Sequence, residues 1–351
     1  MSKIHFLKAK HGDAFILECY RGTNRGVVVV DGGPFSNKEE FVDELNKYEK
    51  IDLMVLTHYD DDHIGGILWY LLTCKAAHKP LTTVEMWANC ATEIKVATTP
   101  QLSTGQALSL ANLLDEYVEK QGLIWQADVK EHLCRVFPFC EIKVLSPSED
   151  VYAAIIERLK ERKRKEEEDV DLRLKGESRQ ERDLEKDLED LVNIRKRNPD
   201  LKNISDLANA GSISFILRCD DLSILMLGDS FPQNVESCLR DIGFSEESPL
   251  KVDYVKVSHH GSRNNISNSL LDIISCNKFI ISTNGGDGKS KHPDRETIAN
   301  IVCHKQRNME EKIFLYFNYS MDIIEANGAP FVKKEDMEKY NFEVVPNIVE
   351  L

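Results

Sequence analysis

The stretch 56–66, LTHYDDDHIGG, constrains this chain more than any other. It places two histidines and three aspartates within six residues, directly after the apolar run 51–56. Such crowded carboxylates and imidazoles repel one another or compete for protons unless a cation neutralises them, and metal ligands must be deprotonated. The alternative is a solvated acidic turn with incidental histidines. We favour a metal site, because acidic turns rarely begin from a buried strand and end on His-Ile-Gly-Gly.

The backbone conformation of this stretch decides which side chains meet. If the chain stays extended beyond the apolar run, His58, Asp60 and Asp62 point to one side and Asp61 to the other, because side chains alternate along a strand. A helix is expected over 64–72, with its positive end facing bound anions.

Length and composition predict one large domain with an insertion. The chain has 351 residues, of which 42% are hydrophobic, enough for a sizeable core. We expect the insertion at 149–207, between 1–148 and 208–351. Its interleaved charges and thin leucine stripe favour one or two long solvent-exposed helices, which serve either as a protein-binding arm or as a spacer.

Several classes of protein are disfavoured. No apolar run approaches the roughly twenty residues of a membrane helix, and the N-terminus shows no signal-peptide segment, so we expect a soluble, cytoplasmic protein without a membrane partner. The nine cysteines form no Cys-x-x-Cys pair, which disfavours disulfides and structural zinc. The net charge of −14 disfavours non-specific binding of long nucleic acid.

Alternating strand and helix signals indicate the α/β class. Apolar runs at 27–30, 51–56, 222–227 and 252–257 end in polar residues: Asp31, the histidine–aspartate cluster, Asp229 and the pair His259-His260. We therefore expect a site at the edge of a sheet sandwich. Two closing strands are expected at 313–317 and 321–325, and the tail beyond 328 carries no clear signal.

The ordered motifs resemble the metallo-β-lactamase superfamily. They are Asp-Gly-Gly at 31–33, Thr-His-x-Asp-x-Asp-His-x-Gly-Gly at 57–66, Gly-Asp at 228–229 and Ser-His-His-Gly-Ser at 258–262. Within that superfamily they are most similar to the hydrolase domain of ComEC/Rec2 competence proteins and its free-standing relatives, which also share a Gly-Asp-Ala opening, here at 12–14. The resemblance implies a four-layer αββα sandwich, interrupted by the charged helical insertion.

The resemblance also implies a binuclear metal site. His58 and Asp60 match the pair that holds the first ion, Asp62 and His63 the pair that holds the second, and Asp229 the bridging carboxylate. Either His259 or His260 matches the last ligand, with a slight preference for His260. Asp31 matches an aspartate that fixes ligand geometry without binding metal.

The sequence departs from the superfamily pattern at the first ion. Many members carry a further histidine where this chain has Asn89 or Cys90, and His78 and His132 are poorly placed substitutes. Asp60 also replaces a commoner histidine. Because carboxylates suit hard ions, this ligand set favours manganese or magnesium more than usual, although zinc stays open.

The predicted activity is metal-dependent hydrolysis of a phosphodiester, most specifically nuclease action on DNA through a metal-bridged hydroxide. Asp62, His260 and His292 are the expected catalytic residues, His292 as proton donor. A phosphate clamp is expected from residues that follow two strands. Its members are Ser262, Arg263, Asn264, Lys289 and Lys291.

Two alternatives remain open. One is hydrolysis of a small ester, such as a phosphocholine ester, a cyclic nucleotide, a lactone or a thioester, since a fold does not fix its chemistry. The other is a partner-controlled component of a defence-type complex, docked to another protein through the charged arm at 149–207.

Overall fold

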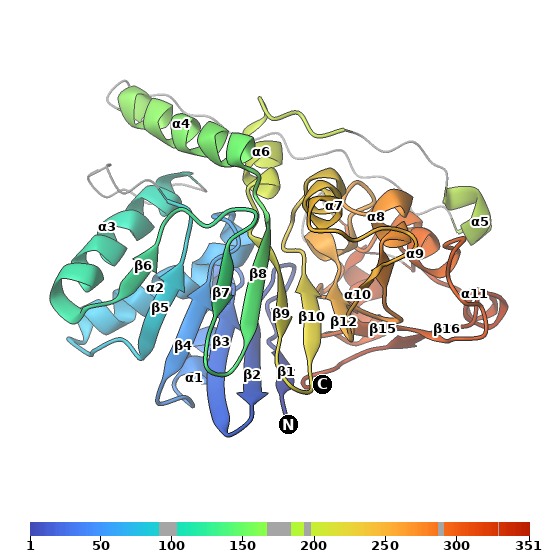
Figure 1. Cartoon of the computed structure of the whole chain (residues 1–351), viewed down its shortest axis with the longest axis horizontal. Helices are drawn as coiled ribbons and strands as arrows, with labels where there is room; N and C mark the ends of the chain where they lie inside the picture. The colour runs from blue at the N-terminus through green and yellow to red at the C-terminus, as the bar shows by residue number, and fades with distance from the viewer. Residues whose placement is uncertain (91–103, 167–183, 193–197, 287–290, 329) are drawn as a thin grey trace.

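Two large β-sheets form the centre of the molecule (Figure 1). The computed structural model describes all residues except 91–103, 167–183, 193–197, 287–290 and 329. The first sheet has the spatial order β1-β2-β3-β4-β5-β6. Its strands are β1 (Lys3–Phe6), β2 (Phe15–Arg21), β3 (Asn24–Val30), β4 (Ile51–Val55), β5 (Thr83–Trp87) and β6 (Ile124–Gln126). The first three strands pair antiparallel, and β3 to β6 pair parallel.

The second sheet has the order β16-β15-β14-β12-β10-β9-β8-β7. Its strands are β7 (Cys134–Val136), β8 (Glu141–Ser146), β9 (Ser214–Arg218), β10 (Ser223–Met226), β12 (Tyr254–Lys256), β14 (Lys278–Ile281), β15 (Ile313–Phe317) and β16 (Phe342–Val345). Strands β10 to β16 of this sheet pair parallel. A separate short pair joins β11 (Leu250–Lys251) to β13 (Ile274–Ser275).

The two sheets pack face to face over a shared apolar core. Phe15 and Val28 of the first sheet belong to the same buried cluster as Phe215, Ile224 and Ile280 of the second. The β-branched run in β3 suits this position, because branched side chains pack well on a pleated surface.

Helices cover the two outer faces of the sheets. The first face carries α1 (Lys38–Leu45), α2 (Asp61–Ala76), α3 (Thr104–Gln121), α4 (Glu149–Glu166) and α6 (Ile204–Ala210). The second carries α5 (Leu188–Leu191), α7 (Pro232–Asp241), α8 (Asn268–Asp272), α9 (Arg295–Val302), α10 (Met321–Gly328) and α11 (Lys334–Lys339). Figure 1 shows these helices on either side of the sheets, so the layers run helix, sheet, sheet, helix. The α/β sandwich prediction is confirmed.

The described parts of the insertion pack onto both outer faces. Val151, Ile155 and Leu159 lie four residues apart on α4 and are buried in the apolar cluster of the first face. Leu188 and Leu191 of α5 are buried in that of the second, and α4 and α5 lie far apart in Figure 1. The solvent-exposed helices expected here are therefore exposed only in part, because α4 and α5 each bury an apolar stripe against a sheet face.

Two other sequence expectations are also wrong. The extended backbone expected through Asp62 ends at Asp60, and α2 begins at Asp61; two acidic residues in the first turn favour a helix start there. The strand expected at 321–325 is α10. The tail beyond 328, for which no structure was predicted from the sequence, supplies α11 and β16. None of the described helices is both long and apolar enough to cross a membrane.

Candidate metal centre

The first turn of α2 carries the centre of the site. His63 is fully buried, and its Nδ1 lies 2.8 Å from Oδ2 of Asp31, at the end of β3. The Asp31 carboxylate also accepts hydrogen bonds from the amide and the hydroxyl of Thr57, each at 2.8 Å. These contacts fix the imidazole of His63 and direct its Nε2 away from Asp31, toward Oδ2 of Asp229 at 3.4 Å.

His58 is held in a similar way after β4. Its Nδ1 lies 3.1 Å from the hydroxyl of Thr57 and 3.0 Å from that of Ser212. Its Nε2 lies 3.7 Å from Oδ2 of Asp60. The Ser212 hydroxyl also accepts the backbone N–H of Asp229 at 2.9 Å. One serine therefore ties His58 to the strand end that delivers Asp229.

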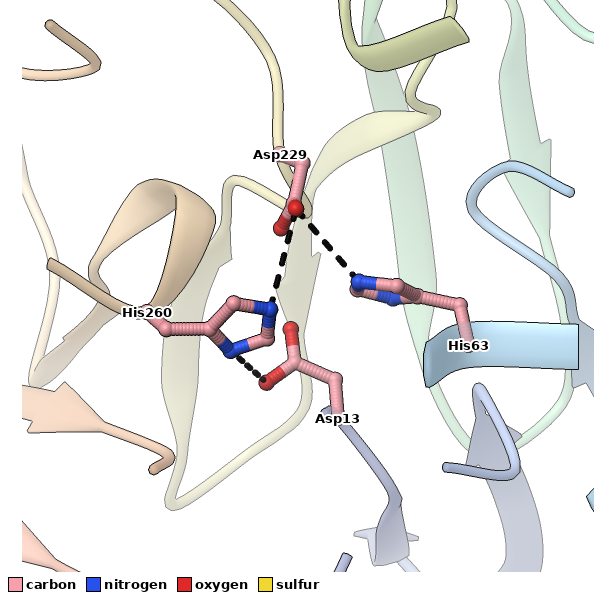
Figure 2. A group of neighbouring side chains, drawn as sticks. All are labelled: Asp13, His63, Asp229 and His260. Carbon is pink, nitrogen blue, oxygen red and sulfur yellow. Dashed lines mark ion pairs between the residues drawn. The ribbon is translucent and has the colours of Figure 1, made fainter. Parts of the chain in front are cut away.

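Asp229 and His260 complete the group from the second sheet. Figure 2 shows both side chains meeting His63 and Asp13, which come from the first half of the chain. His260 Nε2 lies 3.7 Å from Oδ2 of Asp229 and 3.4 Å from Oδ2 of Asp62. Its Nδ1 lies 3.0 Å from the carbonyl oxygen of Ser282. The ring is thus fixed with Nε2 facing the carboxylates.

The neighbouring His259 is more exposed. Its side chain is 29% accessible, against 4% for His260. Its Nε2 lies 3.8 Å from Oδ2 of Asp229, and its Nδ1 lies 3.1 Å from Oδ1 of Asn265. Both histidines have left-handed backbone, with φ of 48° and 54°. Backbone of this kind is strained outside glycine and concentrates at functional sites.

Asp13 and Lys256 lie in the site, although neither was among the residues predicted for it. Asp13 follows the β1–β2 turn region, and its Oδ1 lies 3.4 Å from Nδ1 of His260. Its Oδ2 forms an ion pair with the ammonium group of Lys256, which lies on β12. A lone lysine in the apolar run before Ser-His-His was the available signal, as was the Gly-Asp-Ala opening.

Asn265, which sequence reasoning also missed, supports the same corner. Its amide nitrogen donates to the carbonyl oxygens of Asp229 and Ser230, at 3.0 and 3.2 Å. Together with its contact to His259, this makes Asn265 a link between the histidine pair and the strand end that carries Asp229. An asparagine three residues after Gly-Ser gives no distinctive sequence signal.

Attraction between the buried carboxylates and the neighbouring cationic groups shifts their pKa values. Burial would raise the pKa of Asp13, but Lys256 and His260 lower it to about 2. Burial would lower the pKa of His260, but the carboxylates of Asp229 and Asp13 raise it to about 10. The pKa of His63 is likewise raised against burial by Asp229 and Asp31. Without a metal, protons on His63 and His260 balance the carboxylates.

The donor atoms fit divalent metal ions. The Nε2 atoms of His58, His63 and His260 and the Oδ1 atom of Asp229 are buried without a hydrogen-bond partner among the described residues. Buried polar atoms are normally paired, so the unpaired Nε2 atoms of three buried imidazoles, each within 4 Å of a carboxylate oxygen, indicate a missing ligand. Ligand atoms of Asp13, His63, Asp229 and His260 all lie within 4.8 Å of one another. Imidazole and carboxylate are the donors that suit zinc, manganese or magnesium.

The motifs in the first quarter of the chain match a known protein family. Residues 9–88 match the model of the metallo-beta-lactamase superfamily. This range contains Asp31 and the cluster from His58 to His63, so the family model supports the superfamily prediction over these residues. The ComEC-type relationship stays a prediction, and no curated protein matches the chain.

Solved structures with a similar outline include YhfI from Bacillus subtilis, a metallo-beta-lactamase fold protein. It is 8% identical, with 100% of this chain and 99% of that chain covered and a TM-score of 0.42. Zinc-bound PqqB from Methylobacterium extorquens is 9% identical, with 99% of each chain covered and a TM-score of 0.42. A long form of RNase Z from yeast is 8% identical, with 90% and 36% covered and a TM-score of 0.38. Such low similarity carries no argument about substrate.

The departure from the superfamily pattern at Asn89 and Cys90 has a structural basis. The Asn89 side chain donates to the carbonyl oxygen of Val129 at 2.6 Å and accepts its N–H at 2.8 Å. Cys90 is buried, and its thiol contacts the carbonyl oxygen of Ala88 at 3.7 Å. His132 contacts Cys238 of α7, and His78 is exposed beyond α2. The Asn89 amide is therefore occupied elsewhere.

The predicted phosphate clamp is assembled only in part. The Arg263 guanidinium contacts Glu296 at 3.1 Å, and the Lys291 ammonium contacts the carbonyl oxygen of Asn327. Ser262 is buried and Asn264 is half-buried; Lys289 lies outside the described residues. Arg263 and Lys291 thus each contact a group of the protein itself.

His292 does lie beside the histidine pair. Its ring centre is 5.3 Å from that of His259, and its Nδ1 is 3.3 Å from Oδ2 of Asp294. Burial would raise the pKa of Asp294, but His292 lowers it, so this carboxyl is ionised.

Proposed function

We propose that this chain is a metal-dependent hydrolase that cleaves phosphodiesters. The observation that carries the proposal is the set of three buried imidazole Nε2 atoms, from His58, His63 and His260, that lack hydrogen-bond partners among the described residues and lie close to Asp60, Asp62 and Asp229. A hydrogen-bonded core would not leave these atoms unpaired.

The proposed ligands divide into two half-sites that share Asp229. Asp62, His63 and His260 would hold one ion, and His58 and Asp60 would hold the other. Asp31 orients His63 by accepting its Nδ1–H, and Thr57 and Ser212 orient His58. Contacts of this kind fix the tautomer of a ligating imidazole and raise its basicity.

When bound, two divalent ions would supply an activated water and would neutralise charge that develops on the phosphate. The chain's own contribution is orientation and proton transfer. The Asp62 carboxylate faces both imidazoles: its Oδ1 lies 3.9 Å from Nε2 of His63, and its Oδ2 lies 3.4 Å from Nε2 of His260. His292, whose Nδ1 lies 3.3 Å from Oδ2 of Asp294, is proposed to donate a proton to the leaving oxygen.

DNA is the first substrate that we propose, on the strength of the ComEC-type motifs. A small phosphoester is the second candidate, and one observation favours it: Arg263 and Lys291 are engaged by Glu296 and Asn327. Binding of a long polyanion relies on such cations and weakens steeply with salt, whereas binding of a small ester does not.

The test uses the purified full chain, stripped with a chelator and reloaded with Mn²⁺ or Zn²⁺. We expect cleavage of single-stranded DNA or bis(p-nitrophenyl) phosphate, and loss of cleavage in the variant Asp62→Ala/His63→Ala. Asp43→Ala, an exposed acidic residue on α1, is the matched control. Unchanged cleavage by the double variant would refute the proposal. A salt titration on both substrates then separates the polymer from the small ester.

A further inference from the structure

Lys256 is an unusual component of a metal centre. It lies on β12 with its side chain fully buried between the sheets. Its ammonium group pairs with Oδ2 of Asp13, donates to the carbonyl oxygen of Gly228 at 3.1 Å and lies 3.9 Å from Oδ1 of Asp229. A buried ammonium group is costly unless it is paired, so this lysine and Asp13 depend on each other.

Asp13 would otherwise be available to a metal ion. Its ligand atom lies within 4.8 Å of those of His63, Asp229 and His260. These four groups could surround a single ion, with Asp13 in place of Asp62 as the carboxylate from the first half of the chain. The ion pair with Lys256 occupies one oxygen of Asp13, and the other faces Nδ1 of His260.

Lys256 also gives the two carboxylate oxygens of Asp229 different surroundings. Oδ2 faces Nε2 of His63, His259 and His260, at 3.4, 3.8 and 3.7 Å. Oδ1 faces the ammonium group. A positive charge on that side repels a metal ion there and leaves Oδ2 as the atom that two ions would share.

We propose that Lys256 is a positioning residue that withholds Asp13 from bound metal, so that the centre holds two ions sharing Asp229 rather than one ion enclosed by Asp13, His63, Asp229 and His260. This inference rests on the proposed function, because it presumes that the site binds divalent ions. The competing explanation is that the Lys256–Asp13 pair merely fills space between the sheets.

Metal stoichiometry, measured without substrate, separates these explanations. The full chain and its variants are loaded with Mn²⁺, dialysed to equilibrium and analysed for metal per chain. We expect about two ions in the wild type. In Lys256→Met and Lys256→Gln we expect about one, bound at least about tenfold more tightly because a repulsive charge is lost and a carboxylate is gained. Asp13→Asn/Lys256→Met should return to about two, since no carboxylate remains to be redirected.

Each outcome decides the question. Two ions in both single variants, with unchanged affinity, would overturn the proposal, as would single variants that stay unfolded by circular dichroism with Mn²⁺ present, because Lys256 would then be structural. A wild type that binds no metal would instead refute the proposed function. Loss of one ion in the single variants, restored in the double variant, supports the positioning role.

Discussion

The Nδ1 atom of His63 lies 2.8 Å from Oδ2 of Asp31, and neither side chain is more than 1% exposed. Asp31 adopts left-handed backbone, with φ of 58°, to reach this position. Because Nδ1 is engaged, only Nε2 of His63 remains for a metal ion. The orientation of the imidazole therefore depends on a residue that does not itself face the proposed ions.

Replacing Asp31 by asparagine should weaken metal binding without removing a ligand. The amide can keep a contact with Thr57 but loses the charge that favours donation by Nδ1–H of His63. We expect the dissociation constant for Mn²⁺ to rise about 10–100-fold, measured by isothermal titration calorimetry. Asp43→Asn on α1 should leave it unchanged. An unaltered dissociation constant in Asp31→Asn would show that the contact does not tune the ligand.

Replacing Asp60 by histidine should shift metal preference toward zinc. His58 Nε2 and Asp60 Oδ2 lie 3.7 Å apart, and imidazole is a softer donor than carboxylate. We expect the ratio of zinc to manganese affinity to rise about tenfold or more, measured by competition dialysis. Asp61→His is the control on the next residue; an equal shift there would contradict a specific role for Asp60.

Metal binding should release protons and strengthen as pH rises. In the metal-free chain, the carboxylates of Asp229 and Asp13 raise the pKa of His260 to about 10 despite burial, and the pKa of His63 is also raised. Both histidines therefore carry protons at neutral pH, and ligation must displace them. Calorimetry in two buffers of different ionisation enthalpy should show net proton release. Equal apparent enthalpies in both buffers would contradict this charge balance.

Leu188 should contribute to stability through the docking of α5. Its side chain is fully buried in the cluster that also contains Ile298 of α9. We expect Leu188→Ala to lower the free energy of unfolding by about 2–5 kcal/mol, measured in urea. The exposed neighbour Glu189 is the control, and Glu189→Ala should change it by less than about 0.5 kcal/mol. Equal effects would mean that α5 is not held by this contact.

From the sequence, the candidate ligands that follow strand ends could be predicted, but the helix start and the buried lysine around them could not. His58, His63, Asp229 and His260 could be placed in one site because each comes after an apolar run, and parallel strands end at a common edge. The start of α2 at Asp61 was missed, since helix and extended chain compete locally and the first turn decides between them. Lys256 was missed because its significance depends on Asp13, which tertiary packing brings to it.

The insertion shows the same limit. Its mixed charges correctly indicated helix, as α4 shows, but Leu188 and Leu191 alone could not reveal which sheet face they would meet. Arg263 and Lys291 were predicted as clamp residues because they are cationic. Their contacts with Glu296 and Asn327 could not be predicted, because tertiary packing brings these residues together.

The mixed origin of the site also bears on how the chain reaches its native state. Asp13 and His63 belong to the first sheet and its helix, whereas Asp229 and His260 follow strands of the second (Figure 2). Neither half alone can gather these donors, and contacts between distant segments form late because loop closure must come first. Uptake of a metal ion would then report that the two sheets have docked, and free metal should shift the equilibrium toward the assembled sandwich.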